Sequence, residues 1–224
     1  MLLVILYVDF INRLQKKFFF YKKYFMQSNY KYITVYGEST PNPSSMKFVA
    51  SNFFITNGEA HEFSADSTTL NNAPLAQALF EMPFIKSLFF SSNFVTVTKT
   101  DDVEWDEIMT PLREFIQSYL REGNPVFNNT GAEQKLRVES QIALDQFGEA
   151  EHKIMALLDE YVRPAVEQDG GLISFKAFED GIVKVVLQGS CSGCPSSQMT
   201  LKSGIENLLK QMMPEVKSVE AVEA

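Results

Sequence analysis

A turn-rich stretch without hydrophobic periodicity divides the chain into two parts. Residues 123–131 read Gly-Asn-Pro-Val-Phe-Asn-Asn-Thr-Gly, and a mixed sequence continues to Ala150. Irregular connections of this length are uncommon inside one compact domain. We therefore expect two small domains, at 33–122 and 151–224, joined by a linker at 123–150.

Six short strand-like runs and two helices are expected in the domain at 33–122. The strands fall at 33–36, 46–50, 53–56, 60–63, 87–90 and 94–98, and the helices at 73–81 and 105–120. Asn57-Gly58 is a two-residue hairpin signal, so the strand runs on either side of it are expected to pair. Apolar residues recur at 3–4 spacing along the second helix, in which Pro111 predicts a kink or a restart.

This first domain contains no recognisable catalytic motif. It lacks a glycine-rich phosphate loop, a nucleophile elbow and a cluster of histidine and carboxylate residues. His61, which stands next to Glu62, is interpreted as a partly exposed strand histidine. Trp105 and the phenylalanines are interpreted as core residues.

The domain at 151–224 has the element order α-β-β-α-β. An apolar helical stripe, strands, a second helix and a last strand are expected at 154–165, 172–178, 182–187, 199–212 and 216–222. Asp169-Gly170-Gly171 ends the first helix and turns the chain. The order predicts a compact mixed layer in which a Cys-x-x-Cys loop precedes the second helix. The whole chain is therefore expected to be of the α+β or α/β class.

Residues 1–32 form an extension that we exclude from the fold. Its apolar run, Leu2–Val8, has seven residues, whereas a membrane-spanning helix needs about 20. Charges follow this run instead of preceding it, no small-residue cleavage site is visible, and a transit peptide would contain more Arg and Ser. A membrane-surface helix stays open. We interpret the extension as upstream sequence before a true start at Met26, or as a disordered segment.

The charge of the chain is distributed unevenly. Residues 1–36 hold six basic residues and one acid, whereas the remainder holds 14 basic and 27 acidic residues. Sequence-independent binding to nucleic acid requires a basic face that neutralises phosphates. The acidic body therefore argues against a nucleic-acid partner.

Only two cysteines, Cys191 and Cys194, occur in the 224 residues. This number excludes a secreted scaffold held by several disulfides. It also excludes a four-cysteine metal site built by one chain alone.

The two cysteines lie in the motif Gly-Ser-Cys-Ser-Gly-Cys-Pro, at 189–195. A two-residue gap lets both sulfur atoms point toward one metal ion or one cluster edge. Pro195 fits the first turn of the following helix, where its missing N–H has no cost. The N-terminus of that helix offers partial positive charge and N–H donors, which lower thiolate pKa and can bind cluster sulfides.

The spacing alone leaves four readings open. Cys191 and Cys194 could form a thioredoxin-like dithiol, although such a motif usually follows the first strand of its domain. They could be half of a zinc site completed by another chain, or half of an iron–sulfur site completed in the same way. They could also be two inert buried thiols, although glycine and serine surround them.

The motifs of both domains together resemble one protein family. In the second domain they are Asp169-Gly170-Gly171, Gly189–Ser197, Thr200–Glu206 and Pro214-Glu215-Val216. These motifs closely resemble the NifU C-terminal domain, also called the Nfu-type domain, over nearly all of 151–224. The first domain resembles the Nfu N-terminal domain through Thr40–Pro43, Met46–Phe48, Pro74–Phe80 and Phe94–Lys99. The pair looks like a two-domain Nfu protein, from which only the stretch before residue 30 departs.

The resemblance implies an iron–sulfur cluster assembly scaffold and carrier that is not an enzyme. In this family two chains hold a [4Fe–4S] cluster between their Cys-x-x-Cys pairs and transfer it to apo-proteins. Cys191 and Cys194 would then be the metal ligands and the cluster-binding residues. The alternative function is a dithiol–disulfide oxidoreductase that uses the same pair, and binding of a [2Fe–2S] cluster stays open.

The same resemblance implies the partners and the location. The partners are a second copy in a cluster-bridged homodimer, apo iron–sulfur client proteins and the upstream assembly machinery, with no nucleic acid and no membrane. The expected location is the cytoplasm of a bacterial-type cell, or the mitochondrial matrix if the chain is eukaryotic.

Overall fold

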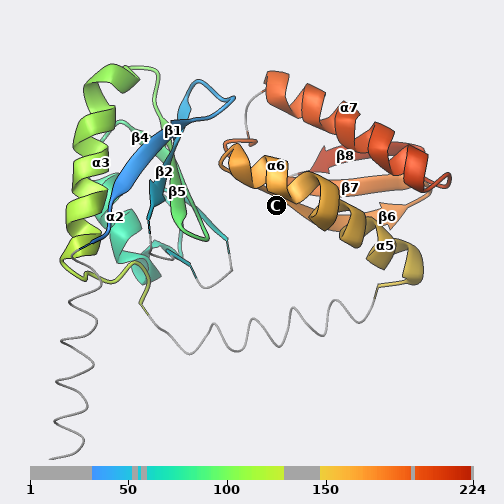
Figure 1. The fold of residues 1–224 in the computed structure, drawn as a ribbon, viewed down its shortest axis with the longest axis horizontal. Helices are drawn as coiled ribbons and strands as arrows, with labels where there is room; N and C mark the ends of the chain where they lie inside the picture. Colours follow the sequence, from blue (N-terminus) through green and yellow to red (C-terminus); the bar gives the residue numbers. More distant parts are fainter. Residues whose placement is uncertain (1–31, 52–54, 57–59, 129–146, 193–194, 223–224) are drawn as a thin grey trace, which may run out of the picture.

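Two separate β-sheets organise the chain (Figure 1). The computed structural model describes residues 32–51, 55–56, 60–128, 147–192 and 195–222. We call residues 32–128 the N-terminal module and residues 147–222 the C-terminal module. Each module has its own main apolar core.

The N-terminal module is a five-stranded antiparallel sheet with helices on one face. Its strands are β1 (Val35–Ser39), β2 (Ser45–Ala50), β3 (His61–Ser64), β4 (Ile85–Ser91) and β5 (Phe94–Lys99), in the order β1-β2-β5-β4-β3. Its helices are the 3-10 turn η1 (Leu70–Asn72), α2 (Pro74–Phe80) and α3 (Trp105–Arg121). Side chains alternate between the two faces of a strand, and Phe48, Phe90 and Val97 belong to the face that packs with α2 and α3.

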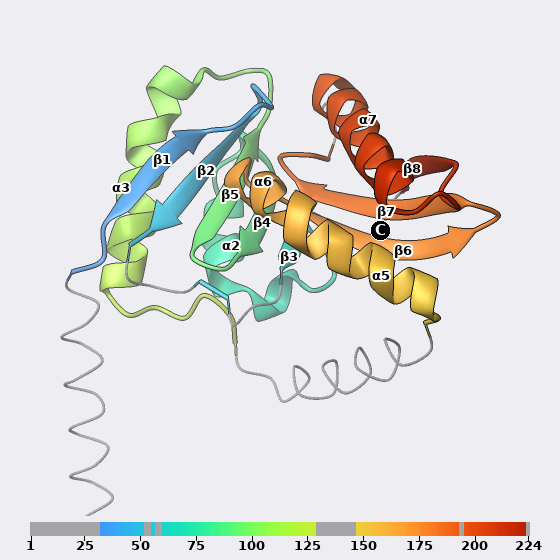
Figure 2. The same ribbon diagram turned by 45° about the vertical axis from the view of Figure 1, so that its right-hand side comes forward.

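A row of directly paired residues crosses the opposite face of this sheet. From β1 to β3 the row contains Glu38, Lys47, Thr96, Phe89 and Glu62. We call it the cross-strand row. The C-terminal module lies on this side of the sheet, away from α3 (Figure 2).

A small third core joins the modules beside the cross-strand row. Val49, Phe89 and Phe94 are buried there, and Leu172 of the C-terminal module packs against them. Because α2 and α3 cover the opposite face, the sheet of the N-terminal module is covered on both faces.

The C-terminal module packs two helical segments against one face of a three-stranded sheet. Its elements are α5 (Glu149–Leu157), η2 (Leu158–Val162), α6 (Arg163–Gln168), β6 (Gly171–Glu179), β7 (Ile182–Gly189), α7 (Pro195–Met212) and β8 (Ser218–Val222). Strand β7 pairs antiparallel with β6 and parallel with β8, so α7 is the crossover connection. The predicted order α-β-β-α-β and the mixed α+β class are confirmed.

The first helix of this module contains a π-helical turn that the sequence pattern did not predict. η2 interrupts the stripe between α5 and α6, immediately before Pro164 in the first turn of α6. Proline has no N–H for the helical ladder, and its ring clashes with the carbonyl group four residues earlier. A wider turn at this point removes the clash without ending the helix.

Two predictions for the N-terminal module differ from the structure. Strand β3 pairs with β4 and not with the run at 53–56, and the N–H groups of Ile55 and Thr56 donate to Ser92 O at 2.6 and 2.9 Å. Residues 52–54 and 57–59, including the Asn57-Gly58 turn, lie outside the described residues. At Pro111 the predicted restart does not occur, because helix α3 is continuous through that residue, whereas the alternative of a kink stays a prediction.

Both ends of the predicted linker are occupied by packed residues. Val126 belongs to the core of the N-terminal module, and the Phe127 ring lies 4.6 Å from the His61 ring, centroid to centroid. Helix α5 begins at Glu149, within the predicted linker. Residues 129–146 and the extension at 1–31 lie outside the described residues, so the predicted boundaries stay predictions.

Candidate functional site

The loop between β7 and α7 carries the first cysteine of the motif. Residues Gly189–Ser192, which we call the cysteine turn, leave the end of β7, and α7 begins at Pro195. Cys191 belongs to the core of the C-terminal module and is 4% exposed. Cys194 lies outside the described residues, so the joint role of the pair stays a prediction.

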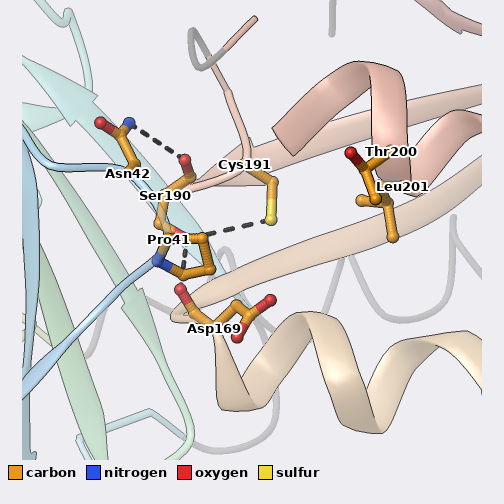
Figure 3. Close-up of a pocket in the computed structure, with 7 residues that line it drawn as sticks. All are labelled: Pro41, Asn42, Asp169, Ser190, Cys191, Thr200 and Leu201. Atoms are coloured by element: carbon orange, nitrogen blue, oxygen red, sulfur yellow. Dashed lines mark hydrogen bonds between the residues drawn. The ribbon is translucent and has the colours of Figure 1, made fainter. Parts of the chain in front are cut away.

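Cys191 borders a cavity of about 360 Å³ to which both modules contribute. The wall of the cavity contains Pro41, Asn42, Asp169, Ser190, Cys191, Thr200 and Leu201 (Figure 3). These residues come from the loop after β1, the end of α6, the cysteine turn and α7. The sulfur atom is therefore shielded from bulk solvent but still adjoins a space larger than a single water molecule.

The cysteine turn is closed by hydrogen bonds of its own. Ser192 donates to Gly189 O twice, from its N–H at 3.1 Å and from its hydroxyl group at 2.9 Å. Gly189 has φ +68°, in the left-handed region that favours glycine. A Cβ atom at Gly189 would lie 2.6 Å from Gly170 O and 2.8 Å from the Phe89 ring, so a side chain at this position would displace the turn or the ring.

The start of β6 fits against the Cys191 side chain because residue 171 is glycine. A Cβ atom at Gly171 would lie 2.8 Å from Cys191 Sγ and 2.7 Å from Gln188 O. The pattern Asp169-Gly170-Gly171 by itself predicts only a helix end and a turn. The structure adds that Gly171 provides the space that the thiol side chain occupies.

The residues before Gly171 hold the middle of the cysteine turn. The Ser190 N–H donates to Gly170 O at 3.2 Å, and the Ser190 hydroxyl group donates to Asp169 O. Gly170 O also accepts a hydrogen bond of 2.7 Å from Thr96 Oγ1 in the N-terminal module. The two modules therefore meet at the backbone that supports Cys191.

Two side chains of the N-terminal module form hydrogen bonds with the cysteine turn. Asn42 Nδ2 donates to Ser190 O at 3.1 Å, and Glu62 Oε1 accepts from the Gly189 N–H at 3.2 Å and from Ser192 Oγ at 3.3 Å. From the sequence, Asn42 is expected only in a turn, and no role is expected for Glu62. The only sequence signals for these residues are that Asn42 lies between two prolines and that Glu62 is a carboxylate on a half-buried strand. Neither signal predicts the residue's hydrogen-bond partner. The interpretation of His61 as a partly exposed strand residue is confirmed.

Burial changes the acidity of two carboxyl groups beside the turn. Removal of Glu62 from water raises the pKa of its carboxyl group, against the lowering effect of hydrogen bonds from Gly189, Ser192 and Gln188. Burial likewise raises the pKa of Asp169, and the nearby charge of Lys47 opposes that effect. Both carboxyl groups therefore hold their protons to a higher pH than they would in water.

The residues that the structure describes contain neither a metal-binding cluster nor a membrane-spanning helix. No group of three or more His, Cys, Asp or Glu side chains there could hold a metal ion. Within the same residues, no helix has both the length and the apolar character needed to cross a membrane.

Comparison with family models gives two matches that together cover most of the chain. The model described as a NifU-like domain matches residues 154–220. The model described as the N-terminal part of the scaffold protein Nfu/NifU matches residues 35–123.

Comparison with known proteins gives relatives of the same kind. A protein of Drosophila ananassae named NFU1 iron-sulfur cluster scaffold homolog, mitochondrial, is 37% identical over 210 residues, which cover 90% of this chain and 71% of the relative. The homolog of the same name from Drosophila sechellia is 38% identical over 185 residues, which cover 83% of this chain and 63% of the relative. A solution structure of a NifU-like protein from Saccharomyces cerevisiae has a TM-score of 0.39 and 23% identity, over 44% of this chain and 87% of that chain.

Proposed function

This chain belongs to the Nfu-type family of iron–sulfur cluster scaffolds, and on that premise we propose that it is a carrier of [4Fe–4S] clusters. The cluster is its cargo, held between two chains and transferred to apo-proteins. The observation that carries this proposal is the position of Cys191, which borders a cavity within the region that matches the NifU-like model. The chemical step is ligand exchange, in which client thiolates replace those of the carrier.

The residues at the site fit an iron–sulfur cargo. Thiolate is the ligand that iron–sulfur clusters prefer, and Cys191 supplies one beside a cavity of about 360 Å³. In our proposal Cys194 supplies the second thiolate of each chain.

The number of cysteines supports a cluster that two chains share. One chain has two cysteines, whereas a [4Fe–4S] cluster is commonly held by four. A symmetric pair of chains brings four thiolates together, and mass action then links cluster binding to dimerisation. Because each chain contributes only two ligands, a client protein can displace them stepwise.

The proposal extends to the domains and to the location. We infer that 33–122 and 151–224 are structural domains, since the two main cores share no residue. Because the fly relatives are named as mitochondrial, we expect this chain in the mitochondrial matrix and not in the cytoplasm. Its clients would be apo iron–sulfur proteins of that compartment.

Anaerobic reconstitution with ferrous iron and sulfide tests the function. We expect a brown protein with thiolate-to-iron absorbance, about one [4Fe–4S] cluster for each two chains, and dimers by light scattering that an iron chelator returns to monomers. Cys191→Ser and Cys194→Ser should each abolish stable binding, because each removes two of the four ligands. Ser203→Ala, a change of similar size on the exposed face of α7, should bind normally.

Two outcomes would contradict the proposal. A loaded monomer that holds a complete cluster without added thiol would exclude the shared site. A colourless protein whose cysteines cycle between dithiol and disulfide would indicate the oxidoreductase alternative.

A further inference from the structure

The cross-strand row of the N-terminal module contacts the backbone of the C-terminal module next to Cys191. Lys47 Nζ donates to Gln168 O at 3.3 Å, and Thr96 Oγ1 donates to Gly170 O at 2.7 Å. Further along the row, the Phe89 ring packs against Gly189, and Glu62 binds both ends of the cysteine turn. Residues of the cross-strand row therefore contact two segments, residues 168–170 and the cysteine turn, and these two segments surround the Cys191 thiol.

Glu62 joins the first and last residues of the cysteine turn through one oxygen atom. Its Oε1 accepts from the Gly189 N–H and from Ser192 Oγ, at 3.2 and 3.3 Å, so the turn cannot widen without breaking a hydrogen bond. The Glu62 strand is fixed in turn by the pairing of β3 with β4. Cys191 lies between the two residues that Glu62 holds.

Asn42 holds the residue directly before Cys191. Its side chain is 7% exposed, and its Oδ1 accepts from the Ser44 N–H at 3.0 Å, which fixes the amide so that Nδ2 points to Ser190 O. The loop that carries Asn42 is supported by Trp105, whose Nε1 donates to Pro43 O at 2.9 Å. A rigid loop therefore forms one wall of the Cys191 cavity (Figure 3).

We propose that the N-terminal module is a working part of the cluster site, in which Glu62 and Asn42 are positioning residues that fix the cysteine turn and thereby Cys191. This inference rests on the proposed function for its purpose, but its structural part concerns the chain without cargo. Fixing the turn before binding reduces the conformational freedom that cluster uptake would otherwise remove. The module then sets how firmly the cargo is retained.

Alkylation of the apo-protein measures whether the turn is held. Because Cys191 is buried, iodoacetamide reaches its sulfur only when the turn opens, and the rate follows the opening equilibrium. Loss of one hydrogen bond should raise that equilibrium about fivefold. Tandem mass spectrometry of the modified peptide reports Cys191 separately from Cys194.

Four variants separate positioning from a general effect of charge or folding. Glu62→Ala should raise the Cys191 alkylation rate about 5- to 25-fold, because two hydrogen bonds are lost. Asn42→Asp keeps the acceptor for the Ser44 N–H but replaces the donor to Ser190 O with a carboxylate oxygen, and should give at least about a fivefold rise. Glu62→Gln keeps the acceptor oxygen and should stay close to wild type, as should Glu107→Ala, which removes an exposed carboxylate of α3.

The loaded protein gives the second readout. After reconstitution, the decay of thiolate-to-iron absorbance in excess chelator should be faster in Glu62→Ala and Asn42→Asp, with an altered visible circular dichroism spectrum of the cluster. Glu62→Gln should restore both properties to those of wild type. A purely structural role would change melting temperature without changing the cluster spectrum.

The outcomes distinguish this inference from the function on which it rests. Cys191 alkylation rates within twofold of wild type in both disruptive variants would overturn the positioning role. If Glu62→Ala fails to fold, Asn42→Asp decides the question alone. Failure of the wild-type chain to take up any cluster would overturn the proposed function, while the alkylation rates would still decide whether the N-terminal module holds the turn.

Discussion

Substitution of Gly171 by alanine tests the packing that places Cys191. The new Cβ would lie 2.7 Å from Gln188 O and 2.8 Å from Cys191 Sγ, and carbon atoms do not approach such atoms so closely without displacement. Gln188 O belongs to the backbone of the β6–β7 ladder, where Leu172 is paired with Gln188. The strain must therefore move the Cys191 side chain or distort the sheet.

The expected loss of stability follows from two opposing terms. Overpacking of this kind costs about 1–3 kcal/mol. Replacement of glycine by alanine recovers roughly 0.5–1 kcal/mol, because the unfolded chain becomes less flexible. We expect a net loss of about 1–2 kcal/mol, which for a domain of this size lowers the melting temperature by roughly 5–15 °C.

Thermal and urea unfolding followed by far-UV circular dichroism measures this change. Trp105 fluorescence reports the N-terminal module separately and should change little. Gly204→Ala is the matched control, since no atom lies within 4 Å of its Cβ position in α7, and it should stabilise the protein by about 0.5–1 kcal/mol. A Gly171→Ala protein that melts at or above the wild-type temperature, with an unchanged alkylation rate of Cys191, would refute the packing argument.

Three further predictions address other parts of the chain. Pro111→Ala should stabilise the N-terminal module by about 1–3 kcal/mol, because it restores an N–H to the interior of α3, and urea unfolding followed by Trp105 fluorescence would measure it. Because burial raises the pKa of Glu62 in the folded protein, the Glu62 side chain makes its full contribution to stability at pH values below the usual pKa of glutamate. That contribution is lost as pH rises through the folded-state pKa. Wild type and Glu62→Gln should therefore melt alike at low pH, and wild type should lose stability relative to that variant as pH increases. Leu172→Asp should separate the modules without disturbing either main core, since Leu172 packs against the small third core and belongs to neither main core. Small-angle X-ray scattering should then show a larger radius of gyration, whereas an unchanged radius would contradict docking through this face.

The sequence predicted the elements of the C-terminal module well because each has a strong local signal. Strand β7 alternates apolar and polar residues, and α7 follows a proline and repeats apolar residues at helical spacing. The π-helical turn was missed because hydrophobic periodicity does not register a single wider turn. Asn57-Gly58 gave the wrong partner for β3, since a turn signal predicts where a chain reverses but not which strand is its neighbour in the sheet.

The contacts at the candidate site could not be predicted in the same way, because they join distant segments. Asn42 and Ser190 are separated by 148 residues, and Glu62 and Ser192 by 130 residues. No local pattern specifies such a pair, and the irregular sequence between the modules does not indicate how the two modules pack against each other. The cysteine motif identified one part of the site, whereas the residues that hold its backbone required the folded arrangement.

One general signal of the docking was nevertheless present in the strands of the N-terminal module. An antiparallel sheet with one solvated face should carry polar residues at every second position. Here β2, β4 and β5 place Val49, Phe89 and Phe94 on the face opposite the helices, and all three are at least 95% buried. Apolar residues on both faces indicate that something covers each face, although they do not identify it. The polar members of the same face, Thr96 and Glu62, bind backbone groups of the C-terminal module. The face therefore combines apolar burial with directed hydrogen bonds, as expected of a surface that fixes the orientation of its neighbour and not only its proximity.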